Sequence, residues 1–99
     1  MERVIVQFSI PGMTSRVYDQ VWDELRKAGH SHPAGLHYHV GAQQGNNWVV
    51  VDVWESLEAF NKFGETLMPI LANAGVNMDA AKPVITPVYY EYDAALVSH

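Results

Sequence analysis

The residue types best suited to chemistry lie in one stretch, residues 36–56, with the sequence LHYHVGAQQGNNWVVVDVWES. Its polar and aromatic residues recur at every second position of two runs. This set comprises His37, His39, Trp48, Asp52 and Trp54. A period of two is typical of β-strands, whose successive side chains point to opposite faces of a sheet. The two runs are therefore predicted to form a hairpin that presents imidazoles, a carboxylate and indoles on one face.

The connection between the two runs sets their pairing. A polar stretch, QQGNN, separates them and is rich in turn formers. A tight turn at Gly45-Asn46, or a four-residue loop, pairs His39 with Asp52. The same register pairs His37 with Trp54. A three-residue loop would place valines opposite the histidines, against the pattern, and is disfavoured.

The predicted pair of His39 and Asp52 is suited to general base catalysis. A carboxylate orients the imidazole, which can then accept a proton from a phenol or an enol. The resulting anion is electron-rich enough to react with O₂. Two other interpretations stay open. The pair can be a structural cross-strand contact worth roughly 0.2–1 kcal/mol, or it can join His37 in a metal site with two histidines and one carboxylate.

The aromatic residues of the stretch are candidates for binding a flat ligand. Trp54 is predicted to stack on an aromatic compound. Trp48 is nearer the hairpin tip, where packing in an interface is favoured. Trp48 and His37 are also candidates for binding the ligand. Phe60 belongs to a helical apolar stripe that is typical of a core. It becomes part of the ligand's wall if the pocket opens beneath the helices.

Two further strands are predicted at the ends of the chain. Residues 3–9 alternate as a strand, and their polar face, with Gln7, is assigned to the pocket. Residues 83–90 form the last strand. Pro87 cannot donate a ladder hydrogen bond, so that strand is expected at an edge or a bulge.

Two helices are predicted between the strands. Thr14 caps the first helix and Gly29 follows its end, while Ser56 caps the second and Gly75 ends it. Pro69 lies inside the second helical pattern, so a kink or a break into two pieces is expected there.

The order β-α-β-β-α-β predicts an α+β fold of the ferredoxin-like class, a four-stranded antiparallel sheet with two helices on one face. Residues 1–99 are expected to form one domain, with a tail from about residue 92. The helices are predicted to cover the valine side of the hairpin. The opposite face, with Trp48 and Trp54, would then be bare in a monomer, which predicts a homodimer with stacked sheets.

Composition narrows the possible partners. The 99 residues carry a formal net charge of −5, with 6 Lys and Arg against 11 Asp and Glu, and no basic patch is visible. Nucleic acid is therefore not an expected partner. The absence of cysteine excludes disulfides and a thiol nucleophile. No apolar run reaches membrane-spanning length, and no signal-like segment opens the chain, so a cytoplasmic location with no membrane partner is expected.

Two segments, IPGMTSRVYDQVWDEL and VVVDVWESLEAFNKF, resemble the antibiotic biosynthesis monooxygenase-like proteins of the dimeric α+β barrel superfamily. In that superfamily a strand ends in a W-x-S or similar turn and leads into a helix with an aromatic residue, here Trp54, Ser56 and Phe60. The resemblance implies paired ferredoxin-like subunits whose sheets form a barrel. Some members oxidise aromatic polyketides with O₂ and neither metal nor flavin, so no cofactor is expected. Trp54 matches the family's pocket tryptophan, and Gln7 stands imperfectly where some members use asparagine.

Departures from the family pattern restrict what the resemblance implies. Members that degrade heme carry a histidine on the second helix, which is absent here. Residues 47–97 contain no arginine, so an arginine clamp on a substrate would have to come from Arg3, Arg16 or Arg26.

The leading functional prediction is a cofactor-independent, monooxygenase-like enzyme acting on a small aromatic or polyketide-type compound. Its catalytic residues would be His39 and Asp52. The residues predicted to bind substrate are Trp54, Gln7, His37, Trp48 and Phe60. The same base could instead serve a cyclisation or an isomerisation. A ligand-binding or accessory protein without chemistry, and the metal site above, stay open as alternatives.

Overall fold

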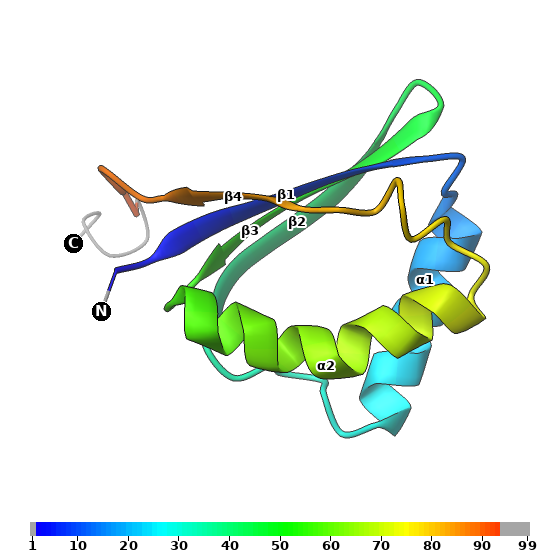
Figure 1. Cartoon of the computed structure of the whole chain (residues 1–99), viewed down its shortest axis with the longest axis horizontal. Helices are drawn as coiled ribbons and strands as arrows, with labels where there is room; N and C mark the ends of the chain where they lie inside the picture. The colour runs from blue at the N-terminus through cyan, green and yellow to red at the C-terminus, as the bar shows by residue number, and fades with distance from the viewer. Residues whose placement is uncertain (1, 94–99) are drawn as a thin grey trace.

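The computed structural model, which describes residues 2–93, has the predicted order of elements (Figure 1). The elements are β1 (Val4–Pro11), α1 (Ser15–Lys27), β2 (Leu36–Gln44), β3 (Asn47–Trp54), α2 (Leu57–Asn73) and β4 (Val84–Pro87). The strands form one antiparallel sheet in the order β2-β3-β1-β4, and both helices cover the same face. The ferredoxin-like prediction is confirmed. Most of the predicted tail, residues 94–99, lies outside the described part of the chain.

The helix boundaries follow from the predicted caps. The Thr14 hydroxyl accepts a hydrogen bond from the backbone N–H of Val17 at 3.3 Å, which satisfies a free donor at the start of α1. The Ser56 hydroxyl does the same for Ala59 at 3.1 Å. α2 continues through Pro69 without a break. Its apolar stripe stays packed in the core on both sides of the proline, which offsets the lost backbone hydrogen bond.

The hairpin has the tight turn and the central pairing that the sequence predicts. Gly45 and Asn46 form a two-residue turn with a φ of 59° at Gly45, as the first position of a type II′ turn requires. His39 therefore pairs with Asp52, as predicted. The predicted pairing of His37 with Trp54 is wrong. A bulge between Leu36 and Tyr38 places Leu36 opposite Trp54 and leaves His37 exposed without a cross-strand partner in the ladder.

The predicted facing of the hairpin is also wrong. The set that turns toward the helices is the one with the aromatic residues and the carboxylate. Its members are Trp48, Val50, Asp52 and Trp54, and all are buried. The valines between them lie half-buried on the other face. In β1 the buried set is Val4, Val6, Phe8 and Ile10, which pairs across the ladder with the buried set of β3. Gln7 is exposed on the opposite face.

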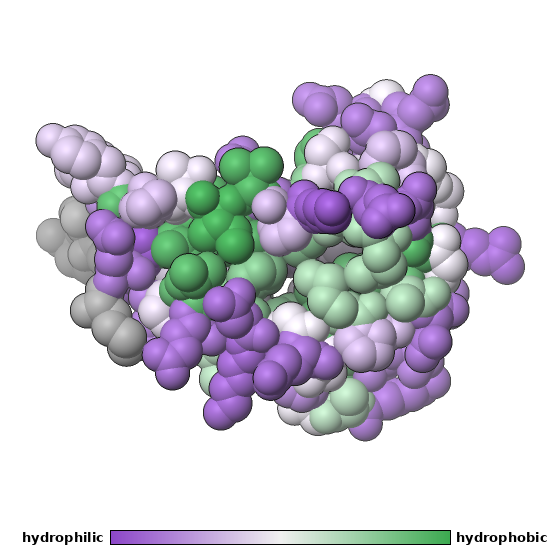
Figure 2. Space-filling view, viewed as in Figure 1, coloured by the Kyte–Doolittle hydropathy of each residue, from purple (hydrophilic) through white to green (hydrophobic). Residues whose placement is uncertain are grey.

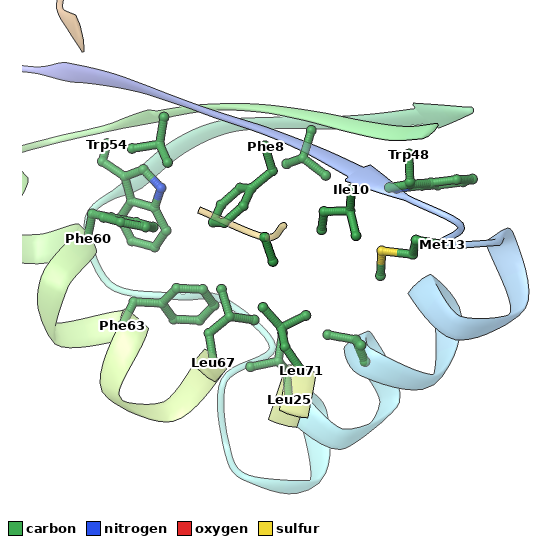
Figure 3. Packing of buried hydrophobic residues seen from close by; sticks show 14 of the residues in the cluster. Phe8, Ile10, Met13, Leu25, Trp48, Trp54, Phe60, Phe63, Leu67 and Leu71 are labelled. Carbon is green, nitrogen blue, oxygen red and sulfur yellow. The ribbon is translucent and has the colours of Figure 1, made fainter. Parts of the chain in front are cut away.

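Aromatic rings form the centre of the layer between sheet and helices (Figure 3). The ring centroid of Trp54 lies 5.0 Å from that of Phe63 and 5.7 Å from that of Phe60, both on α2. Phe8 on β1 lies 6.2 Å from Phe60. These large side chains explain which sheet face the helices cover, because burying an indole or a phenyl ring removes more apolar area from water than burying a valine.

Some apolar surface remains exposed beside the edge strand β4. Figure 2 shows apolar side chains gathered between β4 and the start of α2. Leu57, Ile85 and Pro87 line a hollow there. Within residues 2–93, neither helix is long and apolar enough to cross a membrane.

Candidate active site

A cavity of about 60 Å³ lies between the sheet and the two helices. Its walls are aromatic and aliphatic, and they include Phe8, Ile10, Trp22, Trp54, Phe63 and Leu71. The ionisable side chains on these walls, within the described part of the chain, are Tyr18, His39 and Asp52. A space that is apolar apart from one ionisable cluster is a common form of small-molecule site.

Asp52 is the most buried member of this cluster, with 5% of its surface exposed. Its Oδ1 accepts a hydrogen bond from His39 Nδ1 at 2.5 Å. Its Oδ2 accepts a second one from the indole Nε1–H of Trp54 at 3.1 Å. A buried carboxylate is costly unless it is hydrogen-bonded, so these two donors account for its place in the core.

The two ring nitrogens of His39 have different tasks. Since Nδ1 carries the proton that is donated to Asp52, a neutral imidazole presents the lone pair of Nε2. Nε2 accepts a hydrogen bond from the hydroxyl of Tyr18. The result is a continuous chain from Tyr18 through His39 to Asp52, which resembles the arrangement that orients histidine as a base in many enzymes.

Tyr18 lies on α1, one turn after the Thr14 cap, and has close neighbours on two sides. Its ring lies 4.8 Å from that of Trp48, centroid to centroid. On the other side it meets the backbone of Gly41, where an added Cβ would lie 3.0 Å from the tyrosine hydroxyl. Gly41 therefore leaves the space that the hydroxyl needs to reach His39.

Burial raises the pKa of the Tyr18 phenol above its ordinary value. The negative charges of Asp52 and Asp19 raise that pKa further, while a hydrogen bond from Trp22 lowers it. Tyr18 is therefore a protonated donor toward His39 at neutral pH.

A groove of about 230 Å³ on the outside of β2 shares Trp22, Leu36 and His39 with the inner cavity. Its other walls include His32 and His37. The Trp22 ring stands nearly perpendicular to that of His39, at 77° and 5.2 Å between centroids. These shared side chains lie between the groove and the cavity.

The structure brings together only part of the site predicted from the sequence. His39, Asp52 and Trp54 meet on the cavity wall. The prediction that Gln7 lies in the pocket is wrong, because its side chain lies on the opposite face of the sheet. His37 lies in the outer groove.

Phe60 and Trp48 pack behind the cavity, against Trp54 and Tyr18 respectively, and do not line it. The sequence pattern does not predict Tyr18 as a residue of the site. The available signal was Gly41, since a glycine inside a strand pattern indicates a close approach by another group.

The predicted metal site is not assembled. Among residues 2–93, no group of three histidines, cysteines or carboxylates is placed to hold a metal ion. The bulge at the start of β2 is the reason, because it turns His37 away from the face that carries His39 and Asp52.

The fold can be compared with known proteins. No family model and no curated protein matches the chain. SnoaB, a cofactor-independent oxygenase from Streptomyces nogalater, has a similar structure, with a TM-score of 0.58 and 15% identity over 94% of this chain and 97% of that one. A monooxygenase from the gene ActVA-Orf6 of Streptomyces coelicolor, in complex with the ligand nanaomycin D, gives 0.60 and 14%, over 92% and 90%. MupZ from Pseudomonas fluorescens gives 0.57 and 10%, over 86% and 71%.

The chain has the fold of the antibiotic biosynthesis monooxygenases. The resemblance inferred from the two sequence segments is thereby confirmed for the fold. Identities this low carry no information on substrate.

The hydrogen bond from Trp54 to Asp52 can be isolated with a matched pair of variants. Trp54→Phe removes an indole and the donor to Oδ2, so the free energy of unfolding is expected to fall. Trp48→Phe removes another buried indole, whose Nε1 has no hydrogen-bond partner among the described residues. Trp54→Phe is expected to cost about 1–3 kcal/mol more than Trp48→Phe in urea denaturation. Equal costs would show that the indole serves packing alone.

Tyr18 is expected to make folding sensitive to alkaline pH. The folded chain keeps the phenol proton at pH values where the unfolded chain, with an ordinary pKa of 10.0, begins to lose it. The contribution is therefore fully present below pH 10.0 and declines as pH rises above that value. Urea midpoints measured on both sides of this pH should decline less steeply for Tyr18→Phe than for wild type. Tyr89→Phe, which alters a fully exposed tyrosine, should retain the wild-type slope. Identical slopes for wild type and Tyr18→Phe would contradict the burial argument.

Proposed function

We propose that this protein is a cofactor-independent, monooxygenase-like enzyme that acts on a small aromatic or polyketide-type compound with an ionisable phenol or enol. The observation that carries the proposal is the His39–Asp52 pair on the wall of an otherwise apolar cavity. The lone pair of His39 Nε2 is on the far side of the ring from Asp52 and faces the Tyr18 hydroxyl, so the imidazole can accept a proton when the substrate releases one.

The pair lowers the cost of forming a substrate anion in an apolar space. When the substrate's O–H bond breaks, His39 Nε2 gains a proton, and the imidazolium is held by the carboxylate of Asp52. The substrate anion and the imidazolium then stabilise each other, and the low polarity of the walls strengthens that attraction.

The anion supplies the electrons for the oxygen chemistry. It passes one electron to O₂, and the substrate radical and superoxide combine to form a C–O bond. The imidazolium returns its proton to the peroxide, the ring proton is lost and the O–O bond breaks, which releases water and leaves a carbonyl. A phenol and O₂ thereby become a quinone and water. The substrate is oxidised and O₂ is reduced, with no further reductant.

The fold shared with SnoaB and with the ActVA-Orf6 monooxygenase supports oxygen chemistry as the first choice. The volume of the cavity restricts the substrate. A space of about 60 Å³ holds only a few water molecules. Binding an aromatic ring therefore requires side chains at the outer groove to move. Trp22 is the largest side chain between groove and cavity, so its displacement would set the size of the accepted compound.

A ligand-binding protein without catalysis is the second candidate, and the missing arginine clamp favours it. Arg3 and Arg26 are exposed and form ion pairs with Glu91 and Asp23. Arg16 is exposed on α1. None of the three lines the cavity, so a substrate anion would depend on His39 alone for a positive partner.

Oxygen uptake tests the enzyme hypothesis. Purified protein is mixed under air with a panel of phenols and enols whose binding is verified by calorimetry. His39→Gln keeps an amide N–H for Asp52 but lacks a base, so uptake is expected to fall by about 10²–10⁴-fold while ligand binding persists. His30→Gln, which alters a histidine that lines neither the cavity nor the groove, is the matched control and should retain the wild-type rate.

Two outcomes would count against the proposal. If His39→Gln retains full uptake, the base is another group. If no bound ligand provokes uptake by wild type, the protein is a binder.

We propose also that two copies associate through the sheet face that the helices leave open. The sequence pattern predicts Trp48 and Trp54 on that face, but the half-buried valines of β3 lie there instead. Its apolar members are Ile5, Tyr38, Val40, Val49, Val51, Val53 and Val84. A cytoplasmic location stays a prediction.

Neighbouring residues of β3 give a test of the association. Val51→Lys places a charge on the open face, so sedimentation at micromolar concentration should show dimers for wild type and monomers for this variant, with the fold intact by circular dichroism. Val50→Lys places the charge in the core and is expected to unfold the chain, because an unpaired buried charge is far costlier. A monomeric wild type would contradict the homodimer.

A further inference from the structure

We propose that Tyr18 is the residue that exchanges a proton with the substrate oxygen, standing between the substrate and His39. The inference rests on the proposed function and names the group that touches the substrate. It follows from counting the free polar atoms that the cluster offers to the cavity.

Both ring nitrogens of His39 are hydrogen-bonded to side chains of the described residues. Its Nδ1–H is donated to Asp52, and its Nε2 accepts the Tyr18 hydroxyl. A ligand in the cavity therefore cannot reach His39 without first removing Tyr18.

The Tyr18 oxygen does have capacity left. A phenol hydroxyl offers one donor and two acceptor positions. The donor is used on His39. Trp22 also acts on the phenol oxygen. At least one acceptor position therefore remains for a ligand's O–H, and Tyr18 is itself part of the cavity wall.

The proton movement balances without any other group. The substrate's O–H bond breaks, and its proton bonds to the Tyr18 oxygen. The original Tyr18 O–H bond breaks at the same time, and that proton bonds to His39 Nε2. Tyr18 ends neutral and donates to the substrate anion, while the imidazolium lies between Tyr18 and Asp52. Asp52 on β3 and Asp19 on α1 are the charged groups that act on Tyr18.

Gly41 gives an independent way to disturb the contact. The tyrosine hydroxyl lies close to this glycine, so a methyl group there would shift the hydroxyl by a few tenths of an ångström and disturb its alignment with His39. The φ of Gly41 is not in the left-handed region, so alanine suits the backbone. Gly41→Ala therefore keeps every polar group of the chain and changes only their alignment.

The probe for the test is 4-nitrophenol, whose phenolate absorbs visible light. With protein in excess, the midpoint pH at which the bound probe ionises is measured for wild type and variants. In Tyr18→Phe the midpoint is expected to rise by about one unit or more, a tenfold loss of bound phenolate at a given pH. Gly41→Ala should shift it in the same direction, with no added shift in the double variant. His39→Gln should raise it at least as far. Tyr89→Phe, the exposed control, should leave it unchanged.

If the ligand instead bonds directly to His39, the midpoint pH is expected to shift in the opposite direction in Tyr18→Phe. Tyr18→Phe would then free Nε2 and lower the midpoint. An unchanged or lowered midpoint in a folded Tyr18→Phe, with a raised midpoint in His39→Gln, overturns the Tyr18 role and leaves the proposed function standing. If neither variant changes the midpoint, or if wild type does not bind the probe, both proposals fail.

Discussion

The buried carboxylate of Asp52 is the constraint on which this structure depends. A charge at this depth is tolerated only when both oxygens have donors. One donor comes from the neighbouring strand and the other from the same strand, two residues on. A one-residue slip of the hairpin would turn His39 to the opposite face and leave Asp52 Oδ1 unpaired. The tight turn at Gly45-Asn46 is thus tied to the chemistry of the cavity.

The same constraint also determines a contact of the first helix, because His39 bonds to a residue of α1. Once the carboxylate holds Nδ1–H, the other ring nitrogen must find a donor inside the fold, and Tyr18 on α1 supplies it. Gly41 makes room for that hydroxyl, and Trp22 covers the edge of the imidazole. The polar groups form one connected chain among apolar walls. Such a chain can receive a proton while the positive charge stays between hydrogen-bonded groups.

Several parts of this arrangement could be predicted from local sequence rules. The caps at Thr14 and Ser56, the turn and the pairing of His39 with Asp52 each depend on a few neighbouring residues. The facing of the sheet could not be predicted in this way, because both residue sets of β3 are apolar enough to be buried. The volume of the indoles, and the donors available to Asp52 beneath the helices, decide between them. The bulge at His37 and the contact of Tyr18 with His39 depend on residues far apart in the chain, so periodicity carries no signal for either.

The tautomer of His39 tests the central claim most directly. In protein labelled with ¹⁵N at histidine, the resonances of the His39 ring distinguish a protonated from an unprotonated nitrogen. We expect a proton on Nδ1 and an acceptor at Nε2 near neutral pH. In Asp52→Asn, this distribution of the ring proton is expected to change. A proton on Nε2 in the wild-type neutral ring would contradict the account, because His39 could then neither be held by Asp52 nor accept a proton from Tyr18.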